Sequence, residues 1–132
     1  MSPVKRIFSV LLTLAMVLAG VTHFTMTATF VALVPDYLPA ALALVHISGV
    51  IEILLGLALQ IPALRRVAAF GLIALFIAVF PANINHAVHN LQPPGLEMSP
   101  TMLWVRLPLQ LVLIAWAWWM TRPDQASAAR TA

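Results

Sequence analysis

Two charged residues stand inside long apolar stretches of this sequence: Glu52 near the middle of one and Arg106 close to the start of another. A charge at membrane depth costs about 2.5–3.5 kcal/mol on insertion scales, so a residue of this kind usually serves a function. A carboxyl group in such a place can bind a proton or a ligand, because burial disfavours its charged form. A guanidinium can hold the oxygen atoms of a ligand with two parallel hydrogen bonds. The two residues therefore indicate a site for protons or for a small polar group.

The composition indicates a membrane protein. Of the 132 residues, 62% are hydrophobic and 8% are charged, whereas soluble domains are about half apolar and a quarter charged. A domain of this size leaves much of its surface outside, so a soluble monomer is excluded. Disorder is excluded by the same composition, and a disulfide-stapled scaffold by the lack of Cys. The net charge of +3 is scattered along an apolar chain rather than gathered in a stripe, so no nucleic-acid partner is expected.

Four apolar stretches are long enough, or nearly so, to cross a bilayer core, which takes roughly 20 helical residues. In lipid such stretches must be helices, because only a helix satisfies its own backbone groups there. We therefore predict an all-α membrane protein, a single four-helix transmembrane bundle over residues 1–132, with spans near 7–22, 40–61, 67–87 and 102–121. For the first stretch a signal peptide is the alternative, since Lys5 and Arg6 precede it, although no convincing cleavage site follows.

The basic residues predict how the bundle is oriented. They occur before the first span, between the second and third, and after the fourth, at Lys5, Arg6, Arg65, Arg66, Arg122 and Arg130. The other two connections contain no Lys or Arg, so the positive-inside rule places both termini in the cytoplasm. The segment from Phe24 to Pro39 is too apolar for a free loop and too short to span. We expect it to be interfacial or partly re-entrant.

With this topology and a helical rise of about 1.5 Å per residue, the intramembrane polar residues gather in the outer half of the bundle. The set is His23, His46, Glu52, Asn83, His86, Arg106 and Gln110. On the second span His46, Gly49 and Glu52 share a helical face, and on the fourth Arg106 and Gln110 do so. The inner half is almost purely apolar. This asymmetry predicts a polar pocket that opens toward the outer leaflet.

The same residues also fit structural roles. Glu52 could fix helix register as the partner of Arg106 or of a histidine, and Arg106 could extend to the outer headgroups. His23, His46 and His86 could converge as metal ligands, but their spacing sets no distances between them. Hydrogen bonding or proton relay is favoured over haem or metal binding for these histidines. No metal ligands are assigned, and the residues do not decide whether the protein is an enzyme.

Five segments, in order along the chain, resemble the DoxX-like family of small four-helix bacterial membrane proteins. They are AGVTHF at 19–24, VPDYLP at 34–39, ISGVIEILLGL at 47–57, FPANI at 80–84 and WVRLPLQ at 104–110. The resemblance spans about residues 5–122 and places the family's polar signature on His23, Glu52, Asn83, Arg106 and Gln110. It leaves His46 and His86 at positions where relatives are expected to vary. It implies a multi-pass protein of the bacterial cytoplasmic membrane, and some relatives are linked to quinone stress or oxidoreductase complexes.

The leading hypothesis is a binding or membrane-anchor subunit of a redox process that holds a quinone-like molecule. Arg106, Gln110 and Asn83 would bond the polar head, and Glu52 with His23 or His46 would handle protons. No cofactor beyond a quinone is indicated. The expected partners are the lipid bilayer and either an oxidoreductase or a second copy of the chain. Two alternatives stay open: a non-catalytic assembly protein whose Glu52–Arg106 network fixes helix packing, and a small proton-coupled transporter.

Overall fold

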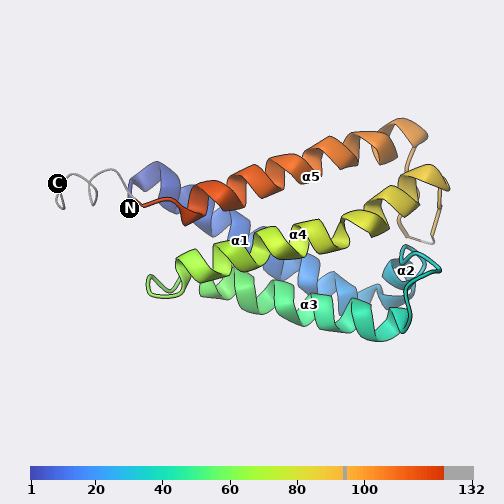
Figure 1. Cartoon of the computed structure of the whole chain (residues 1–132), viewed down its shortest axis with the longest axis horizontal. Helices are drawn as coiled ribbons and strands as arrows, with labels where there is room; N and C mark the ends of the chain where they lie inside the picture. Colours follow the sequence, from blue (N-terminus) through green and yellow to red (C-terminus); the bar gives the residue numbers. More distant parts are fainter. Residues whose placement is uncertain (94, 124–132) are drawn as a thin grey trace.

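The computed structural model describes residues 1–93 and 95–123, and within them the chain forms five helices and no strand (Figure 1). They are α1 (Pro3–Thr25), α2 (Thr27–Val31), α3 (Ala41–Ala58), α4 (Arg65–Val88) and α5 (Pro100–Thr121). All except α2 are long and apolar enough to cross a membrane. The prediction of an all-α protein with four membrane spans is confirmed.

The helix ends follow local sequence signals. The Ser99 side chain caps α5 by accepting a 3.3 Å hydrogen bond from the backbone N–H of Met102, and Pro100 occupies the first helical turn. Ser2 and Pro3 repeat this arrangement at the start of α1. Both pairs suit a helix start, since a serine oxygen satisfies an unpaired N–H and proline needs no donor there. The second span ends at Ala58, three residues before its predicted end.

The long helices form two closely packed pairs, α1 with α3 and α4 with α5, joined by a smaller contact between α3 and α4. The start of α1 and the end of α5 lie together at one end of the bundle, and α2 lies at the other (Figure 1). We call these the termini end and the α2 end. At the termini end the Phe8 ring meets the rings of Trp116 and Trp119 edge-on, at 5.8 and 5.5 Å between centroids.

The apolar core occupies the half of the bundle nearer the termini end. Its fully buried members include Leu12 on α1, Leu72 on α4 and Ala117 on α5, with Leu59 just after α3. Toward lipid the helices present large apolar side chains instead: Val67 is 70% exposed and Leu18 66%. Apolar surface on this scale is stable only in a hydrocarbon environment, so the chain is a multi-pass membrane protein.

Glycines allow α1 and α3 to approach closely. A Cβ atom on Gly20 would lie 2.7 Å from the carbonyl oxygen of Gly49, and one on Gly49 would lie 2.8 Å from the Cβ of His23. Both distances are too short for any side chain, so only glycine fits at this crossing. Two of the predicted site residues, His23 on α1 and Glu52 on α3, lie beside this crossing. Small residues at helix crossings are common in membranes, where packing replaces the hydrophobic effect between helices.

The segment after α1 contains α2 and the turns that follow it. Thr29 and Leu33 are buried, and the Asn85 side chain of α4 donates a 3.2 Å hydrogen bond to the carbonyl oxygen of Leu33. This segment packs on α1 and α3 and is bonded to α4, so it links the two helix pairs at the α2 end. The prediction that it is interfacial or partly re-entrant concerns its depth in the bilayer and stays a prediction.

We predict that G20A and G49A each destabilise the protein by about 1–3 kcal/mol, the usual cost of overpacking a tight contact. The measurement is the free energy of unfolding in detergent micelles. G71A is the matched control, because a Cβ there would meet only the methyl groups of Leu55, which can move aside. Alanine also favours a helix over glycine, so G71A should be neutral or slightly stabilising. Equal losses from all three variants would contradict the proposed close crossing.

Candidate functional site

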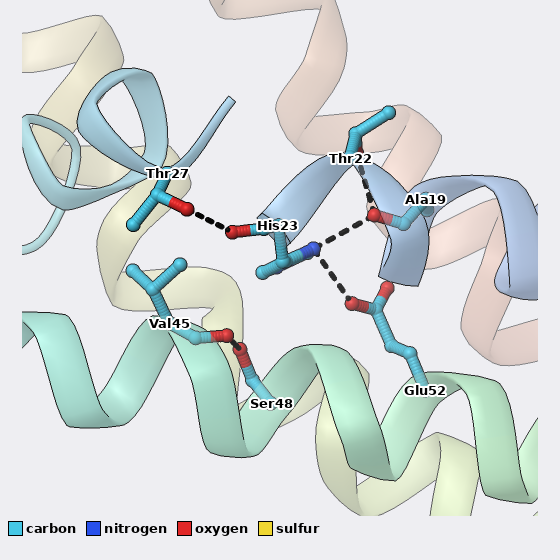
Figure 2. Close-up of polar contacts among 7 residues, drawn as sticks. All are labelled: Ala19, Thr22, His23, Thr27, Val45, Ser48 and Glu52. Carbon is cyan, nitrogen blue, oxygen red and sulfur yellow. Dashed lines mark hydrogen bonds and ion pairs between the residues drawn. The ribbon is translucent and has the colours of Figure 1, made fainter. Parts of the chain in front are cut away.

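His23 on α1 and Glu52 on α3 form a pair across the crossing of these helices (Figure 2). The Nδ1 atom of His23 lies 3.3 Å from a carboxyl oxygen of Glu52 and 2.8 Å from the carbonyl oxygen of Ala19. A backbone carbonyl can only accept, so Nδ1 carries a proton. Each side chain is 12% exposed. The carboxyl group of Glu52 is thus held in the bundle interior next to a proton-bearing ring.

Aromatic contacts hold the two histidines of this region. The His23 ring stacks on the Phe30 ring of α2, with 4.3 Å between centroids and 13° between planes. The His46 ring of α3 stacks on Phe24, with 5.1 Å between centroids and 9° between planes. His46 is on the same helix as Glu52, but its described ring contact is with Phe24 rather than with His23 or Glu52. Stacking on α2 sets the orientation of the His23 ring, which in turn sets its hydrogen bonds.

A second polar group lies between α4 and α5 and consists of Asn83, His86 and Arg106; we call it the Arg106 group. The guanidinium of Arg106 donates from Nη1 to Nδ1 of His86 over 2.9 Å and from Nη2 to the amide oxygen of Asn83 over 3.3 Å. The sulfur of Met98 lies 3.8 Å from Nη1. Among the described residues Arg106 has no carboxylate partner. Its charge is stabilised by neutral acceptors alone.

His86 is the most buried polar side chain of this group, with 1% of its surface exposed. Arginine can only donate, so Nδ1 of His86 accepts, and a neutral ring then carries its proton on Nε2. This Nε2 atom is buried and has no hydrogen-bond partner within the described structure. An unpaired buried donor costs about 1–3 kcal/mol, so the atom is a natural contact point for an acceptor.

Gln110 lies one helical turn after Arg106 on α5, and its described contact joins α5 to α4. Its side-chain amide donates a 3.0 Å hydrogen bond to the carbonyl oxygen of Phe76 on α4. The carbonyl of Phe76 is next to that of Ile77, whose helical N–H donor is removed by Pro81. Gln110 therefore ties α5 to α4 and offers less to a ligand than the sequence suggests.

Five of the seven predicted site residues thus fall into two groups rather than one network, while His46 and Gln110 have other described contacts. His23 and Glu52 pair between α1 and α3, and Asn83, His86 and Arg106 join α4 to α5. The contacts of the described residues do not include the direct Glu52–Arg106 pairing that the sequence raised. The reason is the helix pairing: α3 packs mainly on α1, and α5 on α4. Each charged residue finds its partner on the helix packed against its own.

A third polar cluster, near the termini end, went unnoticed in the sequence. The amide nitrogen of Gln60 lies 2.7 Å from the hydroxyl of Thr13 and 3.0 Å from that of Ser9, and Thr13 donates to the carbonyl oxygen of Gly56 over 2.8 Å. Ser9 and Thr13 are uncharged and blend into an apolar helix, so only their placement four residues apart, on one face, could have indicated them. The cluster closes the space between α1 and the end of α3.

No group of three or more His, Cys, Asp or Glu side chains within residues 1–93 and 95–123 could hold a metal ion. The His23–Glu52 pair can exchange a proton, and the Arg106 group can donate hydrogen bonds to an acceptor.

A sequence model of a family described as a domain of unknown function, DUF8561, matches residues 12–121. The chain belongs to this family. The match covers all four membrane spans except the first turns of α1, and both polar groups fall within it. Comparisons with curated proteins and with solved structures gave no match. The family description assigns no activity, so function has to be argued from the two polar groups.

We predict that H23F and E52Q are energetically coupled. In a double-mutant cycle the coupling should be about 0.5–3 kcal/mol, the range for side chains in direct contact. The measurement is the free energy of unfolding of the four proteins in mixed micelles. H23F keeps a ring that can stack on Phe30 and removes only the polar contact.

The control cycle pairs E52Q with N83A, whose side chain belongs to the Arg106 group and has no partner in common with Glu52. These two changes should be additive within about 0.5 kcal/mol. Coupling of similar size in both cycles would show that the two groups act as one network, against the arrangement described above.

Proposed function

We propose that this chain is a membrane-embedded binding or anchor subunit of a redox process, and that it binds a quinone-like molecule at the Arg106 group. The observation that carries the proposal is the buried, unpartnered Nε2 of His86 beside an arginine without a carboxylate partner among the described residues. The site presents hydrogen-bond donors in an apolar setting. Its ligand should therefore carry acceptor oxygens on an apolar body.

A quinone matches these requirements. Its ring carries two carbonyl oxygens, which accept hydrogen bonds, and no donor, and its body partitions into lipid. One carbonyl oxygen would accept from Nε2 of His86, and the guanidinium of Arg106 would stabilise the charge that develops on reduction. Asn83 would hold the guanidinium in place through its amide oxygen. Gln110, bonded to the backbone of α4, would support the helix pair rather than touch the ligand.

Reduction of a quinone to a quinol consumes two electrons and two protons. In this proposal the electrons come from a partner oxidoreductase in the membrane. The His23–Glu52 pair would supply protons to the region of the bound quinone, because a carboxyl and an imidazole in contact can pass a proton between them. The protein would act in the bacterial cytoplasmic membrane with both termini in the cytoplasm, so the Arg106 group would face the outer leaflet. We also propose that the chain is related to the DoxX-like proteins.

A structural role is the second candidate, and one observation favours it. The contacts between one site residue and another join two helices of the same pair: His23 to Glu52 for α1 and α3, and Arg106 to His86 for α4 and α5. Such contacts fix helix register in a bilayer, and a chain that serves only as an assembly or packing subunit would need nothing more. The two functions differ in one respect: only the binding function requires these side chains to contact a ligand.

The proposal predicts that ubiquinone-1 binds the purified protein in lipid nanodiscs and that R106Q and H86F weaken this binding. The expected loss is about 10–100-fold for R106Q, because a hydrogen bond from a charged donor contributes about 1.5–3 kcal/mol. For H86F it is about 2–10-fold, because the Nε2–H of a neutral ring contributes about 0.5–1.5 kcal/mol. The measurement is the dissociation constant from equilibrium dialysis.

R66Q is the matched control, since Arg66 lies at the opposite end of α4 and contacts the Phe70 ring there. It should bind ubiquinone-1 like the wild type, and thermal unfolding should show which variants remain folded. The structural role predicts the reverse pattern, in which H86F and R106Q lower stability and no protein binds the quinone. A folded R106Q with wild-type affinity would also overturn the proposal.

A further inference from the structure

A cavity of about 270 Å³ lies at the termini end of the bundle, far along the helices from both polar groups. It is formed by the start of α1, the start of α4 with the turn before it, and the end of α5. Four of its nine described lining residues are basic: Lys5, Arg65, Arg66 and Arg122. The volume is about nine times the ~30 Å³ that one water occupies in the liquid. The cavity is large enough for a phosphate group and a small polar substituent.

The charged side chains among the described residues that line the cavity are all basic. Lys5 is only 6% exposed, and its ammonium group donates to the backbone carbonyl oxygen of Arg122, which holds it at the wall. The Arg65 guanidinium is fixed by a 2.9 Å bond from Nε to the carbonyl oxygen of Leu59. Because α4 begins at Arg65, the positive end of its dipole adds to the same field.

The surroundings of the cavity distinguish a lipid from a soluble anion. The cavity lies at the ends of membrane-spanning helices, which is the level of the lipid headgroups. Beside its mouth α1 and α4 expose large apolar side chains to the hydrocarbon: Val67 is 70% exposed, and Val4 and Ile7 are each 58% exposed. An acyl chain could lie on this surface while its phosphate occupies the basic cavity. A free phosphate would leave that apolar surface unused.

We propose that this cavity binds the phosphate headgroup of an anionic phospholipid of the phosphatidylglycerol type. Basic pockets between transmembrane helices are a recognised way of binding such headgroups. The site is separate from the Arg106 group and does not depend on the proposed redox function. It would anchor the termini end in the leaflet that carries the anionic lipid.

The test is native mass spectrometry of the full chain in detergent, titrated separately with phosphatidylglycerol and with phosphatidylcholine of the same acyl chains. The expected result is at least tenfold tighter binding of phosphatidylglycerol. Loss of one basic residue near a membrane surface weakens lipid binding about fivefold. K5Q and R122Q should each weaken the binding of phosphatidylglycerol by more than this. R122Q keeps the backbone carbonyl that Lys5 binds, so it tests the charge even if K5Q proves unstable.

R6Q is the matched control, because Arg6 follows Lys5 on α1 but is exposed and does not line the cavity. It removes the same charge at the same level and should weaken binding by fivefold or less. Equal losses from R6Q and R122Q would show a diffuse attraction to the surface and overturn the site. Equal affinity for the two lipids would do the same. Displacement of phosphatidylglycerol by millimolar inorganic phosphate alone would assign the cavity to a soluble anion.

Discussion

A polar group inside a bilayer has no water to bind, so it must find its partner within the protein. Most features of this chain follow from that constraint. Glu52 takes the ring of His23, Arg106 takes the ring of His86 and the amide of Asn83, and Gln110 takes a backbone carbonyl of α4. Each of these contacts crosses from one helix to the helix packed on it. The polar residues therefore help to specify which helices pair.

The two helix pairs are built in different ways. The crossing of α1 and α3 depends on Gly20 and Gly49, whose lack of side chains allows the backbones to meet. The contact of α4 with α5 depends on long side chains that reach across, from Arg106 and Gln110. A close glycine crossing leaves little freedom, so His23 and Glu52 are held at a set distance. The Arg106 group is built from flexible side chains and retains a buried nitrogen without a partner among the described residues, which suits a site that receives a ligand.

The sequence was sufficient for the parts of the fold that depend on one helix at a time. Apolar runs predicted the four spans. Glu52 and Arg106 stood out because a charge in an apolar run is rare. Their partners could not be predicted, since periodicity places a residue on a face of its own helix and says nothing of the helix that covers it. Ser9 and Thr13 were missed for a related reason: neither is polar enough to stand out before Gln60 is known to lie beside them.

The segment around α2 contacts helices of both polar groups. Phe30 of α2 stacks on His23, and the turn after α2 accepts a hydrogen bond from Asn85, which lies one residue before His86. A movement of this segment would thus change the orientation of the His23 ring and the packing beside the Arg106 group together. If protons pass through the His23–Glu52 pair while a ligand is held by Arg106, the two events have to be coordinated across the gap between the helix pairs. The α2 segment, which is hydrogen-bonded to α4, and the direct contact between α3 and α4 are both connections through which such coordination would act.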